Sequence, residues 1–143
     1  MTYAYTLARK LLDPRLQSFC YRSALVIYLL ILVLGSIPGA RHEIGEYAPG
    51  GVLHALAYSG LTVLLFVGKG KHLNTRAIGA VLTVAAMGAG DEFVQSFFPY
   101  RGADVADWLV DIGASLAAAT VMYFIYPRLT QGVSEATPAP TRG

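Results

Sequence analysis

The stretch SALVIYLLILVLGSI, residues 23–37, decides the fold class of this chain. It contains no charged residue, and a helix needs roughly 20 mostly apolar residues to cross the hydrocarbon core of a bilayer. With its flank it forms the first of four apolar stretches, which cover about residues 21–37, 51–67, 77–98 and 107–126. We therefore predict an all-α, polytopic membrane protein, a bundle of four transmembrane helices.

The composition agrees with this prediction and excludes several functional classes. The 143 residues are 55% hydrophobic and only 14% charged, with a mean hydropathy of +0.49, whereas about 25% of a soluble domain is charged. The single cysteine, Cys20, can form no intramolecular disulfide and no thiolate metal cage. The sequence has no nucleophile elbow, phosphate-cradling glycine loop or nucleic-acid-binding motif. We expect a lipid bilayer as partner and no nucleic acid.

The distribution of lysine and arginine predicts the orientation in the membrane. Of the 11 basic residues, only Arg41 and Arg101 lie in the loops after the first and third stretches. Because basic residues are retained on the cytoplasmic side, we predict that both termini are cytoplasmic. Residues 1–18 are then a basic, amphipathic cytoplasmic segment, residues 19–126 the four-helix membrane domain, and residues 127–143 a disordered cytoplasmic tail.

Most of the acidic residues fall on the opposite, outer side of this predicted topology. Acidic side chains at membrane depth are costly and are seldom kept without a function. Asp91 and Glu92 interrupt an otherwise apolar stretch, where a helix has no structural need for two consecutive acids. Of the nine acids in the chain, the outer seven are Glu43, Glu46, Asp91, Glu92, Asp104, Asp107 and Asp111.

Helical periodicity gathers some of these acids into one place. Asp91 and Glu92 point about 100° apart at about 3.6 residues per turn, and Gln95 falls between them one turn further along. Asp107 and Asp111 lie one turn apart on the same face. Small residues crowd both stretches, so the third and fourth predicted helices can pack closely. We expect one polar site in the outer half of the bilayer.

The second predicted helix adds His54 and Tyr58, one turn apart, to this site. The five acids of the third and fourth helices cannot all be ionised beside the single Arg101, because like charges and removal from water disfavour the ionised form. Three remedies exist: Arg101 folds back as a counter-ion, some acids hold protons, or a divalent cation binds. Carboxylates with one histidine suit magnesium, calcium or zinc, although no recognised metal-binding spacing is present.

Structural interpretations compete with the functional ones. His54 alone is more often a hydrogen-bonded interhelical residue than a catalytic one. Asp107 and Asp111 are equally well explained as acids that stabilise a helix N-terminus, and Asp104 as a loop residue. The aromatic residues near the predicted membrane surfaces are typical of interfacial anchors; they are Tyr100, Trp108, Tyr123 and Tyr126.

The polar residues occur in a definite order between about residues 50 and 115. This order is His54-x-x-x-Tyr58, then Asp91-Glu92-x-x-Gln95, then Pro99-x-Arg101, and then Asp107-x-x-x-Asp111 with a nearby glycine. It resembles the VanZ-like family of small integral membrane proteins. The most specific part is the D-E-x-x-Q element followed by the arginine and the spaced acids.

The chain departs from that family at two positions. Members often have a lysine three positions before the histidine, where this chain has Gly51, and a glycine three positions after the last acid, where Gly113 comes one position earlier. The resemblance implies a bacterial cell envelope, and thus a multi-pass protein of the cytoplasmic (inner) membrane. One family member is associated with teicoplanin resistance, but the resemblance supplies no reaction and does not make this protein a resistance factor.

Three functional hypotheses follow. The first is a membrane enzyme that acts on a lipid, a lipid-linked precursor or another amphipathic ligand from the outer leaflet. The second is a homo-oligomeric protein that binds or conducts cations or amphiphiles. The third is an accessory partner of an envelope enzyme. For the enzyme, we predict Asp91, Glu92, His54, Asp107 and Asp111 as catalytic residues, and Arg101, Gln95 and Tyr58 as substrate-binding residues.

Overall fold

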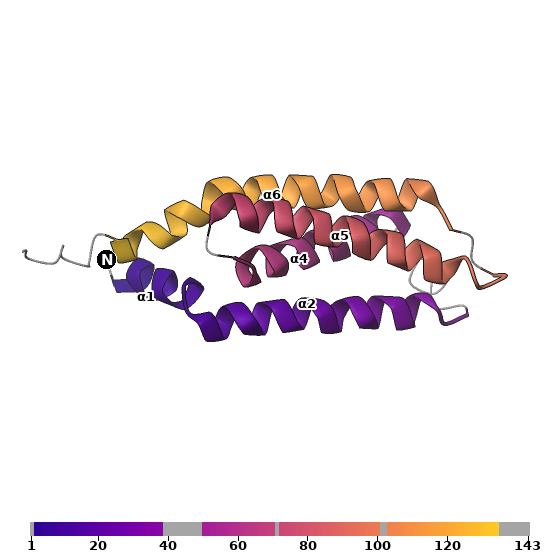
Figure 1. The fold of residues 1–143 in the computed structure, drawn as a ribbon, viewed down its shortest axis with the longest axis horizontal. Coiled ribbons are helices and arrows are strands. Elements are labelled where there is room, and N and C mark those ends of the chain that lie inside the picture. The colour runs from indigo at the N-terminus through magenta and orange to yellow at the C-terminus, as the bar shows by residue number, and fades with distance from the viewer. Residues whose placement is uncertain (1, 39–49, 71, 101–102, 135–143) are drawn as a thin grey trace, which may run out of the picture.

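The computed structural model describes residues 2–38, 50–70, 72–100 and 103–134. Across these ranges the chain forms helices and no strand. The helices are α1 (Thr2–Leu11), α2 (Pro14–Gly35), α4 (Gly50–Gly68), α5 (Leu73–Gln95) and α6 (Val105–Ser134). All except the short α1 are long and apolar enough to cross a membrane, and Figure 1 shows these long helices running side by side. The predicted all-α bundle of four transmembrane helices is confirmed.

The break between α1 and α2 comes at Asp13 and Pro14. The Asp13 side chain accepts a hydrogen bond of 2.8 Å from the backbone N–H of Arg15, as an N-cap residue does. Pro14 occupies the first turn, where its fixed φ angle suits a helix and its missing N–H costs nothing. The first long helix therefore begins at Pro14, within the predicted N-terminal segment of residues 1–18.

α4 lies in the centre of the bundle and contacts α2, α5 and α6. Its buried side chains, which include Leu61, Leu65 and Phe66, form the hydrophobic core together with Val84 and other residues of α5. α2 is more peripheral, because it buries only Cys20 and Ala24 among its described side chains. The outward leucines and valines of α2 are exposed, as suits a surface that faces lipid.

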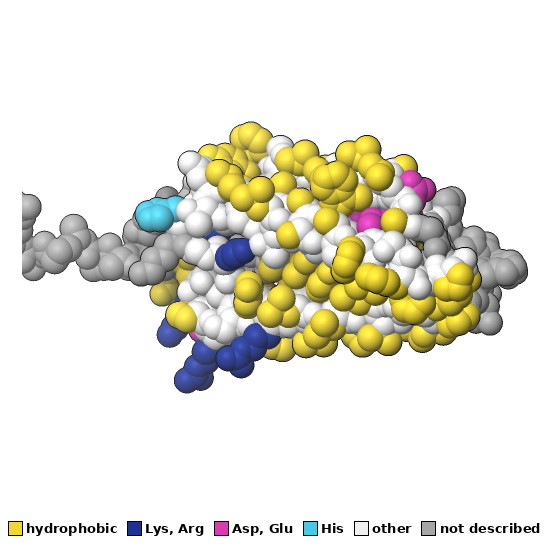
Figure 2. All heavy atoms as spheres, turned by 45° about the vertical axis from the view of Figure 1, so that its right-hand side comes forward, with side chains coloured by type: hydrophobic (Ala, Val, Ile, Leu, Met, Phe, Trp, Pro, Cys, Tyr) yellow, Lys and Arg dark blue, Asp and Glu magenta, His cyan; other side chains and the backbone are white. Residues whose placement is uncertain are grey.

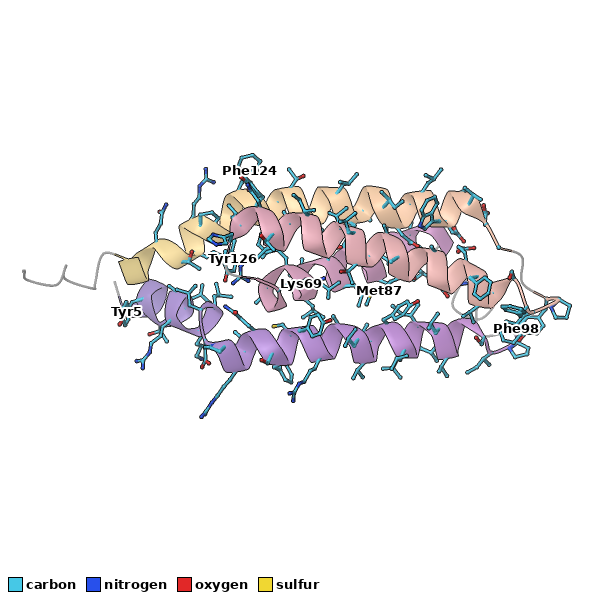
Figure 3. All side chains as sticks on the ribbon, in the orientation of Figure 1. Tyr5, Lys69, Met87, Phe98, Phe124 and Tyr126 are labelled. Atoms are coloured by element: carbon cyan, nitrogen blue, oxygen red, sulfur yellow. The ribbon has the colours of Figure 1, made fainter. Side chains whose placement is uncertain are left out.

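α6 continues past the predicted end of the membrane domain. Pro127 lies inside the helix, which extends to Ser134, so the prediction of a disordered tail from residue 127 is wrong for residues 127–134. Tertiary contact explains the extension: α6 packs on α1, and the Tyr126 hydroxyl donates a 3.2 Å hydrogen bond to the carbonyl of Leu11. In Figure 3, Phe124 points away from the bundle, whereas Tyr126 lies on its inner side and is 5% exposed. The remaining residues of the predicted tail lie outside the described residues.

The charged residues occupy opposite ends of the bundle. Figure 2 shows Lys and Arg side chains at one end of the visible face, with Asp and Glu toward the other and hydrophobic side chains between them. At the basic end Arg76 is buried, and it donates hydrogen bonds of 3.0 and 2.7 Å to the carbonyls of Phe66 and Val67. Arg76 thereby satisfies carbonyls that the last turn of α4 leaves without helical partners.

Candidate functional site

A histidine and two aspartates join α4 and α6 at the acidic end of the bundle. His54 Nδ1 lies 3.0 Å from Oδ1 of Asp111, and His54 Nε2 lies 3.8 Å from Oδ2 of Asp107. Asp111 is fully buried, whereas the side chains of His54 and Asp107 are each 12% exposed. With Asp111 as a carboxylate, Nδ1 carries the hydrogen and donates it. In the neutral imidazole, the lone pair of Nε2 then faces Asp107.

Tyr58 and Asp91 form a second polar pair, one helical turn from His54 on the side of the hydrophobic core. The Tyr58 hydroxyl donates a 3.1 Å hydrogen bond to Oδ2 of Asp91, and both side chains are buried. The rings of Tyr58 and His54 are nearly parallel, with an angle of 13° between them and their centroids 5.8 Å apart. Tyr58 thus links Asp91 on α5 to the face of α4 that carries the histidine.

Glu92 reaches the start of α6 from the neighbouring position on α5. Its Oε2 accepts a hydrogen bond from the backbone N–H of Asp104. The Asp104 side chain in turn accepts a 2.8 Å hydrogen bond from the N–H of Ala106, so Asp104 caps the helix. The N-terminus of α6 favours negative charge nearby. One carboxylate oxygen of Glu92 therefore has a hydrogen-bond partner. Asp104, which the sequence suggested to be a loop residue, caps the N-terminus of α6.

Glycine lets the two acidic helices approach closely. A Cβ atom placed on Gly88 would lie 2.8 Å from Oδ2 of Asp111 and 3.1 Å from Cδ1 of Trp108. Trp108 crosses the same interface and donates a 3.0 Å hydrogen bond from Nε1 to the carbonyl of Ala85. A side chain at position 88 would force Asp111 or Trp108 to shift from its place in this interface.

Several buried carboxylate oxygens in this cluster lack a hydrogen-bond partner among the described residues. They are Oδ1 of Asp91, Oε1 of Glu92 and Oδ2 of Asp111. Within the described part of the chain, the only cationic group that pairs with any of these three acids is His54, if it is protonated. An ionised carboxylate buried without a partner costs several kcal/mol (an order-of-magnitude figure). A proton or a bound cation would satisfy these oxygens.

On the side of the hydrophobic core, the last buried polar groups next to this cluster are Thr62 and Ser115. The Thr62 hydroxyl contacts the carbonyl of Tyr58 at 2.7 Å and Oγ of Ser115 at 2.9 Å, and all three residues are buried. Further toward the basic end, the neighbouring buried side chains of the core are apolar and include Leu65 and Val84. Apolar packing therefore bounds the polar cluster on the side of the hydrophobic core.

A pocket lies beside Glu92, at the edge of the cluster. It has a volume of about 220 Å³ and is lined by Ala89, Glu92, Ala103, Val105 and Trp108. Glu92 is the only acid of the cluster in this lining, and its other neighbours are mostly apolar. A larger apolar pocket of about 310 Å³ lies between α5 and α6 near Tyr123 and Phe124, away from the acids. The smaller pocket therefore places a mostly apolar lining beside the buried Glu92 side chain.

The structure brings most of the predicted site residues together. Gln95 is buried one turn beyond the acid pair of α5, but Arg101 lies outside the described residues, as do Glu43 and Glu46. Sequence reasoning missed Trp108, because an aromatic residue near a helix end is typical of a membrane interface. The residues that meet at the acidic end are His54, Tyr58, Asp91, Glu92, Asp107 and Asp111.

The group can transfer protons or hold a cation. A ligand atom from each of His54, Glu92 and Asp107 can be chosen so that all three lie within 4.8 Å of one another. Histidine and carboxylates are also the commonest groups for general acid–base chemistry. Comparison of the chain with models of protein families, with curated proteins and with solved structures gives no match.

Proposed function

We propose that this chain is an enzyme of the bacterial inner membrane, VanZ-like in its polar residues, that acts on a lipid or a lipid-linked precursor. The observation that carries the proposal is the small pocket beside Glu92, which joins a mostly apolar lining to a buried acid. An amphipathic substrate fits such a surface because its apolar part contacts the lining while its headgroup reaches the carboxylate.

The acids and the histidine have different roles in this proposal. Glu92 borders the pocket and exchanges a proton with the headgroup, and His54 supplies a basic nitrogen across the site. Asp111 orients His54 through the 3.0 Å contact to Nδ1. Asp91 is held by Tyr58 on the core side, so we assign it to positioning. Arg101, which lies outside the described residues, is assigned to an anionic headgroup from its position in the sequence pattern.

The apolar packing on the core side of the polar cluster favours an enzyme over a conducting protein. A permeation path needs polar groups across the whole bilayer, but below Thr62 and Ser115 the buried neighbours include Leu65 and Val84. The segregation of charge supports the orientation: basic side chains lie at the end that carries α1. With both termini cytoplasmic, the site faces the outer leaflet.

The test is mass spectrometry of membrane lipids and lipid-linked precursors from cells that carry the wild-type chain or Glu92→Gln at equal protein levels. Asp13→Asn is the matched control, because it makes the same acid-to-amide change at an exposed position at the basic end. We expect one species to accumulate or disappear only with Glu92→Gln. Identical profiles for all three proteins would overturn the proposal.

A further inference from the structure

We propose that His54, Glu92 and Asp107 together bind one divalent transition-metal ion, Zn²⁺ or Mn²⁺. The first support is the geometry. Ligands bound to one tetrahedral ion at about 2.0–2.2 Å lie roughly 3.3–3.6 Å apart. The three candidate atoms lie within 4.8 Å of one another, so side-chain movements on the order of 1 Å bring them to bonding positions.

The orientation of the imidazole is the second support. Metal-bound histidines usually donate their other ring N–H to a carboxylate, which fixes the tautomer and the direction of the ring. His54 has this arrangement, because Nδ1 lies 3.0 Å from the buried Asp111 and Nε2 faces Asp107. At 3.8 Å, the distance between Nε2 and the Asp107 oxygen is too long for a direct hydrogen bond but suits two ligands of one ion.

The third support is independent of the clustering of the acids. Glu92 is 8% exposed, and its Oε1 has no hydrogen-bond partner among the described residues. The other oxygen of Glu92 already accepts a backbone N–H. A cation between Glu92, Asp107 and His54 offsets two carboxylate charges, and it also reduces the cost of the buried charge on Asp111 nearby.

The types of ligand select the metal. Mg²⁺ and Ca²⁺ prefer sites made entirely of oxygen, whereas one imidazole with carboxylates suits first-row transition ions. Three protein ligands leave at least one coordination position open, as in catalytic metal sites. If the proposed function also holds, a metal held by Glu92 and His54 would polarise an oxygen of the substrate headgroup, in place of the proton transfer assigned to these two side chains. Binding of the metal itself does not depend on the proposed function.

The experiment titrates the full, metal-stripped chain in detergent with ZnCl₂ or MnCl₂ alone. Calorimetry gives the stoichiometry and affinity, and electron paramagnetic resonance follows bound Mn²⁺. We expect one ion per chain. His54→Gln should weaken binding at least 10-fold, and Asp111→Asn 10- to 100-fold, because partners of a ligand have effects of that size. His72→Gln is the matched control, because His72 is exposed and makes no side-chain capping hydrogen bond.

Thermal unfolding separates loss of binding from loss of folding. The metal should raise the melting temperature of the wild-type and His72→Gln proteins but not that of a folded His54→Gln protein. Absence of saturable binding by folded wild-type protein would overturn the metal site, as would wild-type affinity in His54→Gln. If Glu92→Gln changes the lipid profile but the wild-type protein binds no metal, only the proposal of a metal site is overturned. Metal binding with unchanged lipids removes only the proposed enzyme.

Discussion

His54 and Asp111 lie 57 positions apart in the sequence, yet Nδ1 of the histidine is 3.0 Å from Oδ1 of the aspartate. This contact joins α4 to α6 at the acidic end of the bundle. It also fixes which nitrogen of the imidazole faces the remaining acids. The same pair therefore stabilises the contact between α4 and α6 and orients the imidazole. Its effect on stability and its effect on function can be measured separately.

A double-mutant cycle measures the stabilisation that this pair supplies. We expect His54→Ala and Asp111→Ala to show a coupling free energy of about 1–3 kcal/mol, because the two side chains share a buried contact. Reversible unfolding in one detergent, followed by circular dichroism, provides the four free energies of unfolding. Additive effects of the two substitutions would contradict the contact.

Tyr58→Phe removes the hydroxyl that donates to Asp91. Both carboxylate oxygens of Asp91 would then lack a hydrogen-bond partner, and we expect a loss of about 1–3 kcal/mol in the free energy of unfolding. Tyr123→Phe is the control, because its hydroxyl contacts Asn74 in an exposed setting; its effect should stay within about 0.5 kcal/mol. Equal effects of the two changes would argue against a special role for the buried pair.

Gly88→Ala tests the close approach of α5 and α6. The new methyl group would lie 2.8 Å from a carboxylate oxygen of Asp111, so we expect the free energy of unfolding to fall by about 1–3 kcal/mol. At Gly113 a Cβ meets nothing within 4 Å. Gly113→Ala should be neutral or stabilise by up to about 1 kcal/mol, because alanine favours the helix. Melting temperatures in one detergent compare the two variants, and their equality would contradict the described packing.

Arg76→Met tests the end of α4. Methionine keeps an apolar stem but loses the hydrogen bonds to the carbonyls of Phe66 and Val67. We expect a destabilisation of about 1.5–3 kcal/mol, the range for a hydrogen bond from a charged donor. Arg128→Met, at an exposed position of α6, should change the unfolding free energy by less than about 0.5 kcal/mol. The same denaturation measurement serves both variants.

Cysteine labelling tests the proposed orientation. Ala103 and Thr75 are both exposed and lie near opposite ends of the bundle. In a Cys20→Ala background, a membrane-impermeant maleimide should label Ala103→Cys in spheroplasts and Thr75→Cys only after the membrane is permeabilised. The reverse pattern would place the acidic end in the cytoplasm and remove the outer leaflet from the proposed function.

Sequence periodicity predicted the four membrane helices and which of them supply the polar groups, because length and helical repeat are local properties. Periodicity could not predict which of Asp91 and Glu92 borders the pocket and which is held by Tyr58. Their side chains point about 100° apart, and only the packing of α5 on α6 decides that Glu92 borders the pocket while Asp91 meets Tyr58. For the same reason Trp108 appeared to be an interfacial anchor until its contact across the helices was known.

The position at which α6 ends also could not be predicted from the local sequence. Pro127 and the polar residues after it are typical of a helix stop, yet the helix continues to Ser134. The contact with α1 outweighs the local preference, and no pattern within residues 127–134 reports on a segment near position 11. Tertiary stabilisation of this kind can be found only once the two segments are placed side by side.

The hydrogen bond from Tyr126 to the carbonyl of Leu11 has a consequence for the making of the protein, because 115 positions separate the two residues. During translation the first helix leaves the ribosome long before its partner exists. α1 therefore lacks its packing partner, α6, while the three membrane helices α2, α4 and α5 are inserted. Insertion of α6 then completes the bundle, so biogenesis ends with a late joining of the earliest and latest helices.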